Sequence, residues 1–224
     1  YRPGTTPPEA ILILIPGFEG GGNSFRILAE NLVPRARESG LRLEVWSFDR
    51  RGHQLEDREG LYIARDALDP QIALDWYFGA ELGLTLHPDL VAGPNRRAEF
   101  HNTHEETAFI ANWTGLVFSH DIDAVVDAAR AAVEEGENVF LGGHSAGTGF
   151  TARYASTNFN PDPNASPDPG YAKLRGLVLL EGGAGSTSET PPSEDELDRM
   201  EDRADGGLFY AVRDNAPRCV DGPA

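Results

Sequence analysis

The chain of 224 residues has the length of one domain, or of one domain that carries a large insertion. Its 19 Lys and Arg residues against 36 Asp and Glu residues give a net charge of −17, which disfavours nucleic acids and anionic membrane surfaces as partners. The longest apolar run, Ala10–Ile15, is far shorter than the roughly 20 residues of a membrane span, so no transmembrane segment is predicted. The single cysteine, Cys219, excludes an intrachain disulfide and leaves both a reducing compartment and export open.

The first fifth of the chain predicts a strand, a helix and a second strand. The continuous apolar run at 11–15, rich in β-branched residues, is typical of a strand that is buried on both faces in a parallel sheet. Glycines dominate the turn at 17–22, and Asn23 or Ser24 is expected to cap the helix that follows. Residues 41–48 predict the second strand, because apolar side chains alternate there with charged ones.

The segment from Asp49 to about His120 is the least regular part of the chain, with short aromatic pieces between proline breaks. Further elements then alternate: a helix at 121–135, a buried strand at 138–141, a helix at 148–156 and a strand at 174–180. Near the C-terminus, Ser193 is expected to cap a short acidic helix. This alternation of strands and helices predicts an α/β domain with a mostly parallel sheet.

The pentapeptide Gly143–Gly147 matches the pattern G-x-S-x-G and lies between a predicted strand and a predicted helix. A serine at such a turn needs a strained backbone, and the flanking glycines avoid collisions with the neighbouring elements. The turn presents the Ser145 hydroxyl at the carboxyl edge of the sheet, next to a helix N-terminus whose dipole favours negative charge. Ser145 is therefore the candidate nucleophile, and the alternative is a serine in a tight turn without chemistry.

Three further segments in the same order make the chain resemble the α/β-hydrolase-fold serine hydrolases of the esterase and lipase group. Residues 11–18 (ILILIPGF) and the following glycines resemble the third strand and oxyanion loop of that family. Phe48–His53 (FDRRGH) resembles its D-x-R-G-H segment after the fourth strand, and residues 174–182 (LRGLVLLEG) resemble its sixth strand. The resemblance implies an α/β-hydrolase fold, with a mostly parallel sheet and helices on both faces.

The resemblance also implies domain boundaries. Residues 1–224 form a single domain, with an insertion at 61–114 that follows the fourth strand and contributes a pocket wall. An acidic lid-like insertion begins after the sixth strand and takes up 184–224, since 11 acidic and four basic residues follow from Glu181 onward.

Carried over to this sequence, the family's roles fall on four residues. Ser145 is the nucleophile, and the backbone N–H groups of Phe18 and Ala146 form the oxyanion hole. Glu181, at the end of the sixth strand, is the candidate acid. The implied activity is that of a carboxylesterase or lipase that cleaves uncharged, lipid-like or small esters through an acyl-enzyme, without cofactor or metal. A peptidase or amidase of the same fold and a non-catalytic binding module are the alternatives.

The general base is the missing member of this set. No histidine follows Ser145; all six are His53, His87, His101, His104, His120 and His144. Because the family order is serine, acid, histidine, we expect the base to lie outside this sequence and the chain to lack the C-terminal part of its domain. A reading frame that continues past Ala224 with an acid and then a histidine would favour the enzyme over the binding module.

Two weaker patterns point to other ligands. Gly17–Ser24 has the form G-x-x-x-x-G-N-S and misses a phosphate-binding loop by Asn23 in place of lysine, while Glu19 adds charge of the wrong sign. Residues 101–106 (HNTHEE) have ligand types that zinc accepts, although contacts within a surface loop explain them more simply. The sequence thus favours a serine hydrolase over nucleotide or metal binding.

Overall fold

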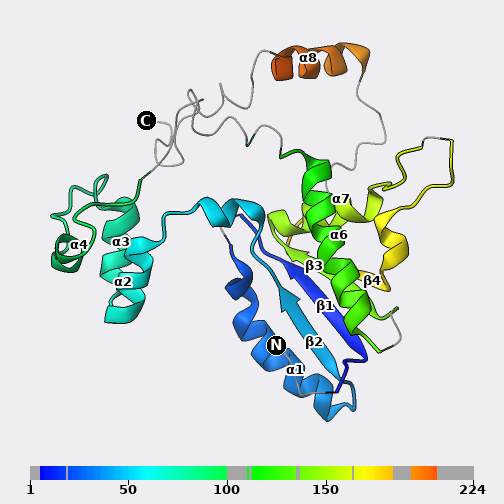
Figure 1. Ribbon diagram of the computed structural model, residues 1–224, viewed down its shortest axis with the longest axis horizontal. Helices are drawn as coiled ribbons and strands as arrows, with labels where there is room; N and C mark the ends of the chain where they lie inside the picture. Colours follow the sequence, from blue (N-terminus) through cyan, green and yellow to red (C-terminus); the bar gives the residue numbers. More distant parts are fainter. Residues whose placement is uncertain are drawn as a thin grey trace. The chain divides into compact units, whose positions relative to one another are not determined.

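The computed structural model describes residues 6–18, 20–99, 110, 113–134, 137–162, 164–183 and 193–205. These residues fall into two compact units (Figure 1). The first unit takes its described residues from 1–50 and 109–209 and contains the sheet, and the second takes its described residues from 51–108. Within the described residues, none of the helices combines the length and the apolarity that crossing a membrane requires.

The first unit is built on a parallel sheet with the strand order β2-β1-β3-β4 (Figure 1). The strands are β1 (Ala10–Ile15), β2 (Leu43–Ser47), β3 (Val139–His144) and β4 (Gly176–Leu180). All three pairings are parallel, so the predicted mostly parallel α/β sheet is confirmed. Because parallel strands end at the same edge, the residues that follow β1, β3 and β4 lie close together there.

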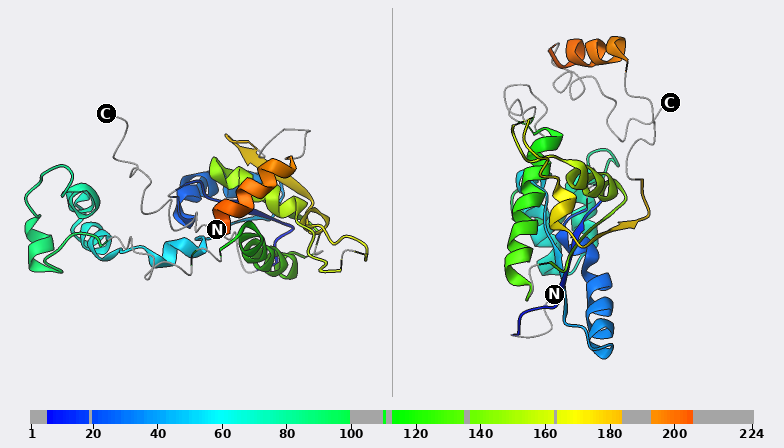
Figure 2. Two further views of the ribbon diagram at one scale, coloured as in Figure 1. Left: turned by 90° about the horizontal axis from the view of Figure 1, so that it is seen from above. Right: turned by 90° about the vertical axis from the view of Figure 1, so that its right-hand side faces the viewer.

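Helices cover both faces of this sheet. One face packs on α1 (Arg26–Glu38), and the other packs on α6 (Gly115–Ala132) and α7 (Ala146–Ser156). Figure 2 (right) shows α1 in blue and α6 in green on opposite sides of the strands. The core under α6 and α7 holds the side chains of Ile11, Ile13, Ile15, Ile122, Val126, Ala129, Val139, Leu141 and Tyr154. The three isoleucines of β1 are thus buried on this face, and Ala10 and Leu14 are buried on the other face against α1, so β1 is covered on both faces as the continuous apolar run predicts.

One local prediction in the first unit is wrong, and one buried carboxylate was not predicted. Asn23 and Ser24 do not cap α1, because both lie inside a 3-10 turn, Gly22–Phe25, that leads into it. Glu44 does not face solvent on β2: it is buried, and its carboxylate accepts a hydrogen bond of 2.7 Å from the indole N–H of Trp46. Both faces of this strand are therefore covered. On one of them, the buried carboxylate of Glu44 is compensated by its hydrogen bond to Trp46.

A polar cluster joins α6 to α7 and to the turn Gly170–Lys173. The hydroxyl of buried Tyr154 donates to Asp123 over 2.9 Å, and the ammonium of Lys173 lies 2.8 and 2.9 Å from the two Asp123 oxygens. Burial raises the pKa of Tyr154, and the negative charges of Asp123 and Asp127 act in the same direction. Tyr154 therefore remains a neutral donor that holds the helix after β3 against α6.

The described residues of the second unit contain three α-helices that the sequence pattern did not predict: α2 (Glu59–Ala67), α3 (Pro70–Phe78) and α4 (Pro88–Ala92). They enclose Trp76, which has no exposed surface. The closest packing is on Gly60 of α2, where an added Cβ would lie 2.1 Å from the indole Cδ2 of Trp76. The segment expected as an insertion, 61–114, overlaps this unit over 61–99 and returns to the first unit by Trp113.

An ion pair closes the second unit over this core. One Asp57 oxygen accepts from Arg96 (2.5 Å) and from the backbone N–H of Glu99 (3.1 Å), and the Arg96 guanidinium lies 5.0 Å from the centre of the Trp76 ring. Partial burial acts to raise the pKa of Asp57, but these hydrogen bonds and the charge of Arg96 outweigh it, so the pKa is lowered.

The acidic helix near the C-terminus is confirmed as α8 (Glu194–Asp205). The backbone N–H and the hydroxyl of Ser193 both donate to the Glu196 carboxylate, over 2.8 and 2.9 Å. These two hydrogen bonds lower the pKa of Glu196. The rest of the expected lid-like segment, 184–224, lies outside the described residues.

Candidate active site

Ser145 occupies the sharp turn between β3 and α7. Its backbone has φ 53° and ψ −122°, a region that residues with a side chain rarely adopt and that costs of the order of 1–3 kcal/mol. The turn is held by its neighbours: the Ser145 N–H donates to the Leu180 carbonyl at the end of β4 over 3.1 Å. The Ser145 carbonyl accepts from the Thr148 N–H over 3.0 Å, and the Thr148 hydroxyl lies 2.6 Å from it.

The two glycines of the pentapeptide are required by close backbone contacts. A Cβ added at Gly143 would lie 2.1 Å from the Gly147 carbonyl oxygen, and one added at Gly147 would lie 2.2 Å from the Ile15 carbonyl oxygen. The first contact allows the chain to reverse between β3 and α7. The second allows the start of α7 to lie directly against the end of β1, as the motif predicts.

The loop after β1 lies beside Ser145. A Cβ added at Gly17 would lie 3.1 Å from the Cβ of Ser145 and 3.2 Å from the His144 carbonyl oxygen. Neither of the predicted oxyanion donors, the backbone N–H groups of Phe18 and Ala146, donates a hydrogen bond to any described residue. Both N–H groups thus have no acceptor among the described residues. Ala146 opens an 11-residue helix whose positive end lies at this point.

A hollow of about 490 Å³ opens in front of Ser145. Its described lining residues include no Asp, Glu, Lys or Arg: they are Gly17, Phe18, Gly20, Ser24, Phe25, Leu28, His144, Ser145 and Leu180. The side chain of Phe18 is 71% exposed at its rim. The hollow therefore offers apolar side chains, those of Phe18, Phe25, Leu28 and Leu180, to a group that reaches the serine.

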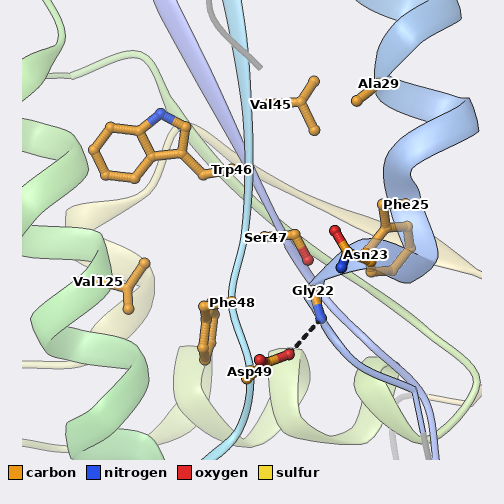
Figure 3. Close-up of a pocket in the computed structure, with 10 residues that line it drawn as sticks. All are labelled: Gly22, Asn23, Phe25, Ala29, Val45, Trp46, Ser47, Phe48, Asp49 and Val125. Atoms are coloured by element: carbon orange, nitrogen blue, oxygen red, sulfur yellow. Dashed lines mark hydrogen bonds between the residues drawn. The ribbon is translucent and has the colours of Figure 1, made fainter. Parts of the chain in front are cut away.

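The segment after β2 ties the glycine loop down. The Asp49 carboxylate accepts from the Gly22 N–H over 2.7 Å (Figure 3), and the Arg50 guanidinium donates to the Gly17 carbonyl over 2.8 Å. A carboxylate that occupies the Gly22 N–H would repel a phosphate at the same place, which argues against the phosphate-loop alternative. Within the segment Phe48–His53, Asp49 and Arg50 thus anchor the loop that carries the Phe18 N–H.

Glu181 and His144 form a pair at the same sheet edge. Glu181 follows β4 directly, has φ 48°, and its side chain is 92% exposed. Its carboxylate lies 3.6 Å from Nε2 of His144, the last residue of β3. The structure thus pairs the candidate acid with the histidine that precedes the nucleophile.

The described histidines other than His144 have their own contacts. His53 is buried in the second unit, where Nε2 lies 3.6 Å from Glu56; in the same unit, His87 accepts from the Asp89 N–H at the start of α4 over 3.2 Å. His120 packs edge-on against Phe159 at 5.2 Å between ring centres. Within the described part of the first unit, no histidine is hydrogen-bonded to the Ser145 hydroxyl.

The pattern at 101–106 that could suggest zinc lies outside the described residues. Among those that the structure does describe, no group of three or more His, Cys, Asp or Glu side chains is arranged to hold a metal ion.

A parallel sheet flanked by helices, with a serine in a strained turn after β3 and a glycine loop beside it, defines the architecture of the α/β hydrolases. The chain belongs to the alpha/beta hydrolase fold family, whose sequence profile matches residues 10–222, and this places it among the hydrolases of that fold. Comparisons with curated proteins and with solved structures gave no significant match.

Proposed function

We propose that this protein is a serine hydrolase that cleaves carboxylic esters through an acyl-enzyme. The observation that carries the proposal is Ser145 itself: a residue with a side chain, held at φ 53° between β3 and the N-terminus of α7. Backbone strain of this kind persists where the surrounding structure determines it and is concentrated at functional sites.

In the proposed reaction, the Ser145 oxygen attacks the ester carbonyl carbon while a histidine base takes the hydroxyl proton. The N–H groups of Phe18 and Ala146 receive the oxygen that becomes negative in the tetrahedral intermediate. The intermediate collapses to the acyl-enzyme as the alcohol leaves with the proton that the base returns. Water then repeats the sequence on the acyl-enzyme and releases the acid. The proposal retains a base that lies outside this sequence.

The hollow beside Ser145 supports an apolar acyl group. Phe25, Leu28 and Leu180 line it together with the exposed ring of Phe18, and its described lining includes no Asp, Glu, Lys or Arg side chain that would hold a carboxylate or an ammonium group. An uncharged ester with an aliphatic acyl chain matches this wall, because each buried CH₂ contributes about 0.8 kcal/mol. A peptide substrate would place amide hydrogens and carbonyls against Phe25, Leu28 and Leu180, whose side chains offer no hydrogen bond.

Glu181 is the proposed acid that orients the base. Its position directly after β4 brings it to the sheet edge that Ser145 occupies. Glu181→Gln is expected to lower kcat by about 10⁴-fold if the carboxylate has this role, as replacing the acid of a catalytic triad by its amide does. A change of less than threefold would instead leave Glu181 only as the partner of His144.

The experiment that tests the function is labelling by a fluorophosphonate, which reacts with activated serines. The protein encoded by the complete reading frame is expected to label, and Ser145→Ala is expected to abolish the label while the urea midpoint of unfolding is unchanged. Parallel assays with p-nitrophenyl butyrate and with the matching p-nitroanilide distinguish an esterase from an amidase. No labelling of the folded protein would refute the enzyme and favour a binding module.

A further inference from the structure

The carbonyl of Gly17 is held by two donors. The Gly20 N–H donates to it over 3.2 Å within the loop, and Nη2 of Arg50 donates to it over 2.8 Å from the segment that follows β2. Next to Arg50, Asp49 holds the Gly22 N–H at the other end of the same loop (Figure 3). The loop is therefore fixed at both ends by consecutive residues of one segment.

This carbonyl belongs to the peptide unit that carries the Phe18 N–H. A trans peptide unit is planar, and its C=O and N–H groups point in opposite directions. A donor that fixes the direction of the Gly17 carbonyl therefore also fixes the direction of the Phe18 N–H. A hydrogen bond to the carbonyl also polarises the unit and strengthens the N–H as a donor.

Arg50 is itself held against the helix that carries the second oxyanion donor. Its guanidinium lies 5.1 Å from the centre of the Phe150 ring on α7, the helix that begins at Ala146. Phe150 in turn packs on Phe118 of α6, with ring centres 5.3 Å apart. A planar guanidinium can stack on an aromatic face and donate a directed hydrogen bond at the same time. The ammonium group of lysine does not combine these two contacts.

We propose that Arg50 is the positioning residue of the oxyanion hole, which holds the Gly17–Phe18 peptide unit so that the Phe18 N–H is directed at the oxyanion. This inference rests on the proposed serine hydrolase activity. The family resemblance does not assign the role, because in FDRRGH the D-x-R-G-H pattern places Arg51 at its arginine and Arg50 at its variable position. Arg50 acts through the backbone and touches no reacting atom.

Removal of the Arg50 side chain is expected to weaken stabilisation of the transition state, which lowers kcat, and to leave substrate binding nearly unchanged. Removal of a complete oxyanion donor costs about 10²–10³-fold in kcat, and a donor that remains but is misdirected costs less. For hydrolysis of p-nitrophenyl butyrate, Arg50→Ala is therefore expected to lower kcat by about 10–100-fold and to change KM by less than threefold. Arg50→Lys retains one donor without the stacking and should recover part of kcat.

A second readout separates positioning from folding. Phenylboronic acid forms a tetrahedral adduct with an active serine, and its inhibition constant is expected to rise in Arg50→Ala by about the factor by which kcat falls. Arg26→Ala is the matched control. Arg26 pairs with Glu30 on the solvent-exposed side of α1 and does not line the hollow. It should leave both constants unchanged.

The outcomes are distinct. If the wild-type protein encoded by the complete reading frame shows no turnover that depends on Ser145, both the proposed function and this inference fail. If the wild type is active and Arg50→Ala has an unchanged kcat, the function stands and the inference is wrong. A purely structural effect would also overturn the inference. In that case Arg50→Ala would lower both the melting temperature and kcat, the inhibition constant of phenylboronic acid would change no more than KM does, and Arg50→Lys would recover none of kcat.

Discussion

A single methyl group added at Gly147 should disable the active site, whereas the same group added two residues later should not. In Gly147→Ala, the new Cβ would lie 2.2 Å from the Ile15 carbonyl oxygen and 3.0 Å from that of Pro16. Both neighbours are backbone atoms, so no side chain can rotate away. The start of α7 must therefore move from the end of β1 by roughly 1 Å, and Ser145 and the Ala146 N–H must move with it.

The magnitude follows from that displacement. Insertion of a group into a filled site costs about 1–3 kcal/mol of unfolding free energy. A misplacement of about 1 Å in a catalytic group lowers the rate by about 10²-fold. Gly147→Ala is thus expected to react with a fluorophosphonate about 100-fold more slowly, measured as a second-order labelling rate, and to unfold at lower urea.

Gly149→Ala is the matched control in the same helix. A Cβ at Gly149 meets no atom within 4 Å, and alanine inside a helix is more stable than glycine by roughly 0.5–1 kcal/mol. This variant should unfold at higher urea and label at the wild-type rate. Equal labelling of Gly147→Ala and wild type, or equal damage by both substitutions, would refute the proposed contact between α7 and β1.

The remaining predictions concern the two polar clusters and the chain itself. Tyr154→Phe is expected to lower the unfolding free energy by about 1 kcal/mol at pH 7. Because folding raises the pKa of Tyr154, its contribution is complete below about pH 10 and is lost as the pH rises. Urea unfolding at pH 7 and 10.5 should therefore show a smaller alkaline loss in the variant, and identical losses would contradict this. Asp57→Asn removes the charge that Arg96 pairs with and should cost about 1.5–3 kcal/mol at pH 7. Because folding lowers the pKa of Asp57, that difference should shrink below about pH 4, and its persistence at pH 2.5 would argue against the ion pair. The 224-residue chain by itself is expected to show no turnover of p-nitrophenyl butyrate, and turnover that disappears in Ser145→Ala would show that its base has been misplaced.

The parallel sheet could be predicted because each strand carries its own signal. The apolar run at 11–15, rich in β-branched residues, is buried in the sheet, and the apolar run at 176–180 forms an edge strand on which Leu177 and Leu179 stay exposed. The pentapeptide marks the end of β3 without any knowledge of distant contacts. The position of Ser145 was predictable for the same reason: its turn is encoded by two glycines two residues away on either side.

The second unit was not predictable, because its helices are specified by contacts between them. Its α2 and α3 have nine residues each, and their packing depends on Trp76 meeting the bare backbone of Gly60. No local period reveals that pairing. The buried pair of Glu44 and Trp46 was missed for a similar reason. Glu44 is buried only because other elements cover its face of β2, and the alternation of residues along the strand does not show which faces are covered.

The strain at Ser145 supports the proposed role of this turn over that of an ordinary chain reversal. A glycine would adopt φ 53° without the steric cost that a Cβ imposes, and the Ser145 hydroxyl makes no hydrogen bond to a described residue that would repay this cost. The turn is stabilised by the Leu180 carbonyl and by Thr148, which form hydrogen bonds with the backbone N–H and carbonyl of Ser145. Neither of them contacts the Ser145 hydroxyl through a hydrogen bond. A fold that needed only the chain reversal would thus gain stability from glycine at this position. The serine is best explained by chemistry that its hydroxyl performs, next to two N–H groups with no partner among the described residues.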